Sequence, residues 1–399
     1  MAMTAAPLAR PKSSAPSSKL PVILSLGLTQ TLAWASSYYL LAILAAPIAR
    51  DTHMPIVAVF AAFSGALLVS AAIGPRVGKT IDRFGGRRVL ILSNVCFASG
   101  LALLAAAQSW LLLCLAWLFL GFGMGMGLYD AAFATLGHLY GVAARFPITA
   151  ITLMGGFAST VGWPLTAWGL DHFGWRATCL GWALAHVLVG IPLNITLPSS
   201  DALPEAEGLP AAPVVALDRT MWLLAFAFAA GWTISTAMAA HLPRLLETIG
   251  ALPAQALLAG VLVGPAQVAA RLADAVLLRR SHPLVAARFA AVLHPLGAGL
   301  LTLGAGAVPA FALLHGAGNG ILTIARGSIP LAIYGPENYG YRLGILGAPS
   351  RVAQAAAPLL FGGLIDAFGA GAFLFSAALG LAALAALCMV QTSLHPRSD

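Results

Sequence analysis

The chain has 399 residues, of which 60% are hydrophobic and only 9% are charged, and its formal net charge at pH 7 is +8. A soluble domain carries roughly 25% charged residues, so this chain has too few charges to cover a water-exposed surface. A mean hydropathy of +0.89 therefore excludes a water-soluble protein and predicts a membrane protein.

The first 20 residues form a polar tail, and an apolar run from Val22 to Ile48 follows it. That run is too long for the apolar core of a signal peptide, and it exceeds the roughly 20 residues that span a bilayer. Backbone polar groups in lipid must be paired within their own segment, so each such run is expected to be a helix. Six spans are expected in the first half of the chain, near 21–47, 55–74, 89–107, 111–136, 147–170 and 177–197.

A second group of apolar runs follows the polar, proline-rich stretch LPSSDALPEAEGLPAAPVVALDR at residues 197–219. This composition is typical of a linker, so we expect a cytoplasmic linker over 198–219 between two six-helix bundles, 21–197 and 220–391. The predicted fold is an all-α polytopic membrane protein with 12 transmembrane helices and cytoplasmic tails at 1–20 and 392–399. The second set of spans is expected near 220–241, 255–278, 284–306, 309–333, 343–367 and 370–391.

The positive charges predict the orientation, because loops on the cytoplasmic side of a membrane are rich in Lys and Arg. With the N-terminus inside, fifteen of the 21 Lys and Arg residues fall on cytoplasmic segments, three on outer loops and three inside spans. We therefore expect both termini in the cytoplasm and a multi-pass location in a bacterial-type inner membrane.

The stretch GPRVGKTIDRFGGRR at residues 74–88 contains five cations and begins like a nucleotide-binding P-loop. A P-loop needs four residues between its first Gly and the Gly-Lys-Ser/Thr, so that backbone N–H groups can surround a phosphate. Here only three residues intervene, and the composition argues against the sheet that such a loop requires. The stretch is therefore interpreted as the connection between the second and third spans, with Gly74-Pro75 ending the second helix.

Three weak sequence matches recur between the two expected bundles. They pair 125–141 with 318–335, 170–178 with 365–373, and Asp82-x4-Arg87-Arg88 with Asp274-x4-Arg279-Arg280, at offsets of 193, 195 and 192. Matches in one order and at one period indicate two related halves. Parallel six-helix repeats with a site between them describe a secondary-transporter fold.

The segment GKTIDRFGGRRVL (78–90) resembles the signature of the major facilitator superfamily, G-x-x-x-D-R/K-x-G-x-R-R, between helices 2 and 3. The charge polarity, twelve spans, central linker and FGWR (173–176) are similar to that family as well, over about residues 20–392. The resemblance implies that Asp82 meets a helix N-terminus or a cation across the halves, as a gate latch. The signature residues would be Gly78, Asp82, Arg83, Gly85, Arg87 and Arg88.

Within the superfamily, the stretch RFPITAITLMGGFASTVGWPL (145–165) is most similar to the monocarboxylate and oxalate:formate transporter branch. The stretch CLAWLFLGFGMG (114–125) lacks the helix 4 Arg of drug/proton antiporters, and GWPLTAWG (162–169) matches their helix 5 motif only in part. The helix 1 Lys that is frequent in the monocarboxylate branch is absent as well.

Helix 8 carries Gln267, Arg271 and Asp274 on one face. A charge at the bilayer centre costs roughly 2.5–3.5 kcal/mol, so such residues are expected to be paired or to face a wet cavity. Arg271 is interpreted either as the ion-pair partner of Asp274 or as a two-pronged ligand of a substrate carboxylate. Arg351 of helix 11 is expected at a comparable depth, and it is interpreted either as a second substrate contact or as a structural cation near a helix N-terminus. In the oxalate:formate branch, which this chain resembles, cations on helices 8 and 11 hold the dicarboxylate.

Helix 10 carries four polar residues on one stripe, which predicts a cavity face: His315, Asn319, Thr323 and Arg326. Arg326 and Asp130 of helix 4 both fall in the inner third of the membrane. We expect them either to pair and close the cytoplasmic gate or to find separate partners. The candidates for binding a coupling proton are Asp130, Asp274 and the histidines His138, His186, His294 and His315.

Helix 1 presents Gln30, Trp34 and Tyr38 at a spacing of four residues, and this face is expected to be either a wall of the substrate site or a packing surface. The cysteines lie singly within apolar segments, so no disulfide, metal site or cofactor is expected. They are Cys96, Cys114, Cys179 and Cys388.

The sequence therefore predicts a proton-coupled secondary transporter for a small organic anion of the monocarboxylate kind, with Arg271 and Arg351 as a charge clamp. The alternative is an exporter of a toxic compound or metabolite, in which the membrane arginines serve gating. No nucleophile–base set indicates an enzyme. The expected partners are the substrate, protons and the bilayer, with no nucleic acid and with a monomer as the functional unit.

Overall fold

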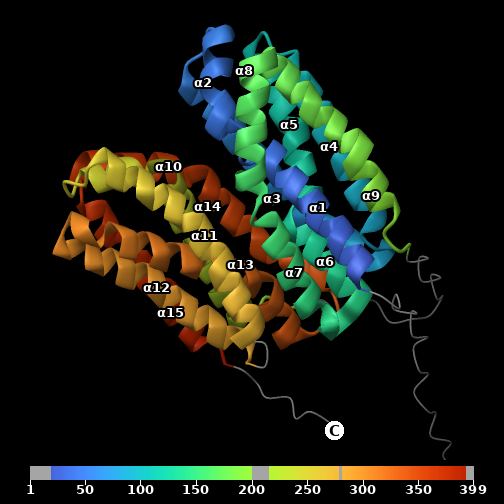
Figure 1. Cartoon of the computed structure of the whole chain (residues 1–399). Coiled ribbons are helices and arrows are strands. Elements are labelled where there is room, and N and C mark those ends of the chain that lie inside the picture. Colours follow the sequence, from blue (N-terminus) through green and yellow to red (C-terminus); the bar gives the residue numbers. More distant parts are fainter. Residues whose placement is uncertain (1–18, 200–214, 278–280, 392–399) are drawn as a thin grey trace, which may run out of the picture.

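The computed structural model describes residues 19–199, 215–277 and 281–391, and every regular element in these ranges is a helix. The helices form two bundles side by side, one from each half of the chain (Figure 1). Most of the expected tails and linker, and the second-half motif residues Arg279 and Arg280, lie outside the described residues.

The first bundle contains each of the six expected spans, and several of these are interrupted. The first span breaks after Ser36, the fourth at Leu128 and the fifth after Gly155, while Gly174 (φ 77°) turns the chain between the fifth and sixth. The helices are α1 (Leu20–Ser36), α2 (Leu41–Asp51), α3 (Ile56–Phe84), α4 (Arg87–Ala105), α5 (Trp110–Gly127), α6 (Tyr129–Tyr140), α7 (Arg145–Gly155), α8 (Ala158–Ala185) and α9 (Ile191–Ile195), with short turns η1 (Gly141–Ala144) and η2 (His186–Gly190).

The second bundle contains the other six spans, each as one long helix. They are α10 (Arg219–Glu247), α11 (Pro253–Leu277), α12 (Pro283–Leu300), α13 (Val308–Tyr334), α14 (Tyr339–Phe368) and α15 (Gly371–Met389), with short turns η3 (Leu301–Leu303) and η4 (Ala305–Ala307). In the described part of the chain, nine helical stretches are long and apolar enough to cross a membrane. One of these, Trp110–Ile195, holds three expected spans, and the more polar α14 adds the twelfth.

The expected end of the second helix at Gly74-Pro75 is wrong, because α3 continues for nine residues beyond Pro75, to Phe84. Proline removes one helical N–H donor and usually kinks or ends a helix. Here the following residues pack along α14 from the other bundle, and tertiary packing outweighs the local propensity. The signature motif is therefore mostly helical, and its loop is confined to Gly85 (φ 74°) and Gly86.

Glycines let α3 and α14 approach backbone to backbone. A methyl group on Gly78 would overlap the carbonyl oxygen of Gly340, and one on Gly344 would overlap backbone atoms of Gly74 and Pro75. This contact joins the bundles at one end of the molecule, which we call the basic end because Arg76, Lys79, Arg83, Arg87 and Arg88 lie there. Toward the opposite end, which carries Arg50, Arg176 and Arg244, the bundles diverge (Figure 1).

The two bundles use glycine in the same way, in agreement with the sequence repeat. In α5, Gly121 and Gly125 pack on α3, and in α13, Gly316 and Gly320 pack on α11. A side chain at any of these four positions would overlap the neighbouring helix. Close contacts at glycine thus hold the fourth span against the second, and the tenth span against the eighth.

Candidate functional site

Three charged side chains from both bundles meet between α6, α13 and α14. Arg326 Nη2 lies 2.8 Å from Asp130 Oδ2, and Arg351 Nη2 lies 2.5 Å from the same oxygen. The expected contact between Asp130 and Arg326 is therefore present. Arg351, which was assigned to the substrate clamp, shares it. We call these three residues the ion triad.

The ion triad holds one negative and two positive groups, so it has an excess of one positive charge. All three residues are buried, with exposed fractions of 7% for Asp130, 7% for Arg326 and 6% for Arg351. Asp130 Oδ1, Arg326 Nε and Arg351 Nη1 have no hydrogen-bond partner among the described residues. Buried polar groups are normally paired, so these three unpaired atoms distinguish the ion triad from an ordinary buried ion pair.

Local backbone features place the triad. Leu128 is extended (φ −81°, ψ −174°) and separates α5 from α6, so Asp130 lies in the first turn of α6, where the helix dipole favours a negative charge. Gly347 stands one turn before Arg351 on α14. A Cβ there would lie 2.6 Å from Asp130 Oδ2 and 2.8 Å from Arg326 Nη2, so only glycine leaves room for the cluster.

Arg271 connects the bundles at a second point. Its Nη1 donates to the carbonyl of Thr152 at 2.7 Å, and its Nε and Nη2 donate to the Gly320 carbonyl and Gln267 Oε1 at 3.3 Å each. Thr152 lies near the break between α7 and α8, where the last turn of α7 exposes carbonyl oxygens. The guanidinium is thus held mostly by neutral acceptors.

The alternative in which Arg271 pairs with Asp274 is not the arrangement found. Arg271 makes the bonds given above, whereas Asp274 lines a small cavity at the basic end together with Arg145 and Ser328. The spacing of three residues on α11 puts both side chains on one side. Arg271, however, extends toward α7 and α13, where carbonyl oxygens satisfy it.

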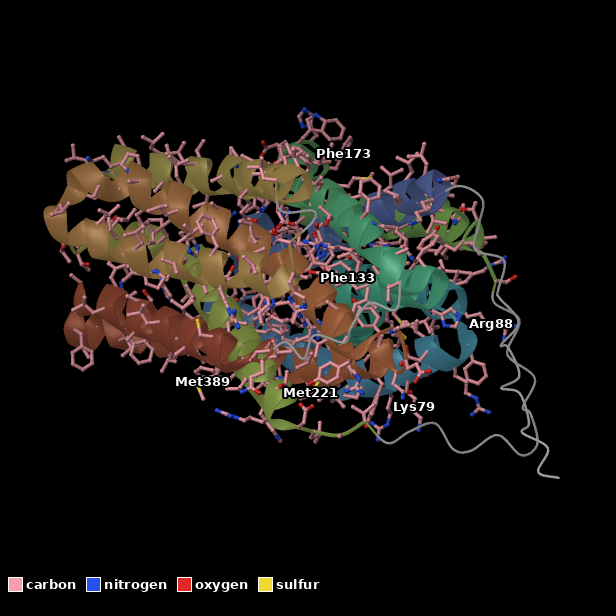
Figure 2. All side chains as sticks on the ribbon, turned by 90° about the horizontal axis from the view of Figure 1, so that it is seen from below. Lys79, Arg88, Phe133, Phe173, Met221 and Met389 are labelled. Carbon is pink, nitrogen blue, oxygen red and sulfur yellow. The ribbon has the colours of Figure 1, made fainter. Side chains whose placement is uncertain are left out.

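An aromatic layer lies next to the triad at the meeting of the bundles. Trp34 of α1 stacks on Trp232 of α10 with ring centroids 6.3 Å apart and planes 6° apart, and Arg326 lies 5.6 Å from the Trp232 ring centroid. Tyr129, next to Asp130, packs on Trp34 at 5.1 Å. Its neighbour Phe133 packs on Gly327 and lies near the centre of the molecule in the view from below (Figure 2).

The expected helix 1 face splits between this layer and structural bonds. Trp34 belongs to the layer, and Tyr38 meets Thr236 of the other bundle, with the two hydroxyl oxygens 3.2 Å apart. Gln30 instead donates its amide to the Gly127 carbonyl at 2.6 Å, which supports the helix break before Asp130. The Trp34 indole N–H has no acceptor among the described residues.

The polar stripe of α13 does not face one cavity as expected, because its residues contribute to two places. Arg326 joins the ion triad, whereas His315 and Asn319 line a cavity inside the second bundle. Thr323 donates to the Asn319 carbonyl one turn earlier. The two ends of the stripe, His315 and Arg326, are eleven positions apart, or about 16 Å along the helix axis, so they reach different surroundings.

The signature motif lies where the bundles join. Asp82 Oδ1 and Oδ2 accept the backbone N–H groups of Gly340 and Tyr341 at 2.8 Å each, in the first turn of α14. A carboxylate at a helix N-terminus is favoured by the helix dipole. Arg88 lies at the periphery of the first bundle, as does Lys79 (Figure 2), and Arg83 rests on the Phe84 ring.

Several residues of the site were not anticipated from the sequence: Trp232, Tyr129, Thr152 and Gly347. Trp232 and Tyr129 were one tryptophan and one tyrosine among many in apolar runs. Both rings lie against Trp34 only because α1, α6 and α10 come together there. Tyr129 could have been found from its position next to Asp130, the one acid of the fourth span.

A family model and a partly matching relative were found in comparisons with known proteins. The family model described as "Major Facilitator Superfamily" matches residues 26–314. A "Multidrug resistance protein B homolog" of Mycobacterium tuberculosis is 32% identical over 134 residues, which are 33% of this chain but only 23% of that relative.

Solved structures show the same fold over nearly the whole chain. The Escherichia coli fucose:proton symporter FucP matches with a TM-score of 0.72 and 15% identity, covering 94% of this chain and 99% of that one. The human organic anion transporter MFSD10 matches with a TM-score of 0.65 and 16% identity, covering 92% and 99%. The monocarboxylate and oxalate:formate branch remains a prediction.

Proposed function

The chain belongs to the major facilitator superfamily, and on that premise we propose that it is a proton-coupled carrier of a small organic anion. Transporters of this fold move their two halves around a site near the membrane midplane. The ion triad and the aromatic layer lie between the bundles, where such a site is expected.

The observation that carries the anion assignment is the excess positive charge of the ion triad. Two buried guanidinium groups share one carboxylate, and each has a donor without a partner. Arginine binds carboxylates through two parallel hydrogen bonds. A small carboxylate that bound Arg351 and Arg326 would neutralise the excess charge and use the unpaired donors.

The same contacts connect binding to movement. Asp130 belongs to the first bundle and both arginines belong to the second, so the ion triad must open before the bundles separate at the basic end. A substrate carboxylate offers the arginines a replacement for Asp130. In this mechanism the substrate lowers the cost of breaking the cross-bundle ion pairs, and the charge clamp and the gate are one structure.

Arg271 is proposed as the second cationic contact of the clamp. Its present acceptors are two backbone carbonyls and one amide, which are weaker partners than a carboxylate. It also crosses between the bundles, so a substrate that captured it would release Thr152 and the first bundle.

The orientation proposed for the protein places the basic end in the cytoplasm. The cations of α3 and α4 at this end follow the excess of Lys and Arg in cytoplasmic loops. The Asp82 contact with α14 then closes the cytoplasmic side. We assign the protein to a bacterial-type inner membrane, with both termini inside and a monomer as the functional unit.

A second candidate is the export of an amphiphilic toxic compound. The stacked Trp34 and Trp232 and the adjoining Tyr129 form a surface suited to flat apolar molecules. The partial match to a multidrug resistance protein homolog favours the same class. In this candidate the ion triad acts only as a gate.

Uptake into proteoliposomes separates the two candidates. We expect saturable uptake of radiolabelled lactate, oxalate or succinate, driven by an imposed pH gradient and absent from empty vesicles. Movement of a cationic dye without any movement of these carboxylates would favour the exporter and would contradict the anion proposal.

A further inference from the structure

A pair of histidines forms a hydrogen-bonded chain inside the second bundle, away from the ion triad. His315 Nδ1 of α13 lies 3.0 Å from His294 Nδ1 of α12. His294 Nε2 lies 3.1 Å from the Ser376 hydroxyl of α15, which donates to the Phe373 carbonyl at 2.8 Å. Both rings are buried, and the two side chains line one cavity.

The directions of these bonds follow from the number of protons available. Because Ser376 donates to Phe373, it accepts from His294, and His294 therefore carries its proton on Nε2. His294 Nδ1 is then an acceptor, so His315 donates from Nδ1. Two ring nitrogens then carry no proton. His294 Nδ1 accepts from His315, and Nε2 of His315 has no hydrogen-bond partner among the described residues. The reverse chain would require the Ser376 hydroxyl to donate to His294 and so to give up its bond to the Phe373 carbonyl.

The pair can bind one more proton but not two. A proton on His315 Nε2 leaves every bond of the chain in place. Each N–H and O–H group of the chain donates in the direction away from His315, so the acceptor atoms face the positive charge on this ring and stabilise it. A second proton would have to enter on His294 Nδ1. It would then face the N–H of His315 across 3.0 Å and put two positive charges on adjoining rings.

The surroundings allow a proton to reach His315. The cavity it lines has a volume of about 30 Å³, and a water molecule needs roughly 10–15 Å³. Asn319, one turn along α13, supplies a polar group in the cavity wall, which Gly231 and Gly318 also line.

No acid or cation of the described chain is among the residues that line the cavity with this pair. Phe311 stacks on the His315 ring, with centroids 5.7 Å apart and planes 4° apart. From the neighbouring helices, Phe228 of α10 and Ala290 of α12 line the cavity, and Ala266 of α11 packs at Gly316, the residue after His315. The nearest charge on the same helix is Arg326, eleven residues along α13, so the pair is a titratable site separate from the ion triad.

We infer that the His294–His315 pair is the proton-binding site of the carrier and takes up one proton at Nε2 of His315. His315 lies seven residues into α13, about 10 Å from the end opposite the basic end. With the basic end in the cytoplasm, His315 lies nearer the outer end of its helix. The inference rests on the proposed function for its role in coupling. One proton per turnover makes the uptake of a monovalent anion electroneutral.

The first test needs no substrate. The purified protein with ¹⁵N-labelled histidine is titrated in lipid nanodiscs and followed by NMR, alone and as His315→Gln, whose amide can still donate to His294. We expect His315 in the Nδ1–H form and His294 in the Nε2–H form at high pH. One titration step that moves both rings should disappear in His315→Gln and persist in the control His241→Gln. The opposite tautomers, or two protons taken up by the pair, would overturn the inference.

The second test measures coupling. For radiolabelled lactate or oxalate in proteoliposomes, His315→Gln should lose uptake driven by a pH gradient by roughly 5- to 150-fold, the range of a coupling free energy. Exchange of labelled for unlabelled anion should stay within about twofold of wild type, because exchange needs no net proton movement. Unchanged pH-driven uptake in His315→Gln would refute the site. If wild type moved no carboxylate, the proposed function would fail, and the NMR titration would still decide whether the pair binds a single proton.

Discussion

Asp130 binds two guanidinium groups through a single carboxylate oxygen, Oδ2, while Oδ1 has no partner among the described residues. The sequence predicts that charged residues inside spans find partners, and the pairing of Asp130 with Arg326 could be expected from their depth. The participation of Arg351 could not, because it depends on the break at Leu128 and on the space left by Gly347. Whether side chains of different helices can contact one another depends on how the helices cross, and the periodicity of a sequence does not describe that crossing.

Removing the shared carboxylate should destabilise the protein. In Asp130→Asn two buried cations lose their counter-charge, and breaking a buried ion pair costs about 3–5 kcal/mol. We expect a clear fall in the thermal unfolding midpoint of the purified protein. Added oxalate should partly restore it by binding the arginines.

The matched control for this variant is Asp366→Asn, which removes the exposed partner of Arg244 at the opposite end. A surface ion pair contributes at most about 1 kcal/mol, so its unfolding midpoint should hardly change. Equal unfolding midpoints for both variants would contradict the claim that the ion triad stabilises the protein.

At the scale of the helices, α3 and α14 determine how the bundles meet. The sequence indicates a helix break at Pro75, yet α3 continues to Phe84 because Gly74 and Gly78 pack against Gly344 and Gly340. A single sequence shows that Gly78 suits a close approach but does not identify its partner 262 residues away. Contacts between distant segments are set by tertiary packing, and this is where local prediction fails.

The variant Gly344→Ala tests this contact. Its methyl group would overlap the backbone of Gly74 and Pro75, so the basic end should open. Spin labels at positions 79 and 336 should report a longer distance in Gly344→Ala than in the parent. Gly65→Ala on α3, where a Cβ meets nothing within 4 Å, is the control and should leave the distance unchanged. An unchanged distance in both variants would show that the close approach does not hold this end shut.

For the whole molecule, hydropathy and repeat spacing predicted the helical class and the twelve spans, because each span must bury its backbone polar groups by itself. The breaks at residues 37–40, 128 and 156–157 were not predicted, since Leu128 and Phe157 are ordinary apolar residues by composition. The breaks after α5 and α7 are also where the site is built: one presents Asp130, the other the Thr152 carbonyl that Arg271 uses.

The orientation can be tested with single cysteines at positions 88 and 173 in a variant without the four native cysteines. Arg88 and Phe173 are exposed side chains near opposite ends of the first bundle. A membrane-impermeant thiol reagent added to intact cells should label position 173 and should reach position 88 only after the cells are opened. The reverse pattern would place the basic end outside and would contradict the proposed orientation.

The central claim, that the buried arginines bind a carboxylate substrate, is tested most directly by carboxylate uptake in Arg351→Gln. The control is Arg244→Gln, which removes an arginine of the exposed pair with Asp366. Hydrogen bonds to a charged group contribute about 1.5–3 kcal/mol, or roughly 10- to 100-fold in binding. We predict that Arg351→Gln lowers kcat/KM for lactate or oxalate uptake by that factor, while Arg244→Gln stays near wild type and Arg351→Lys recovers part of the loss. Wild-type uptake kinetics in Arg351→Gln would contradict the account.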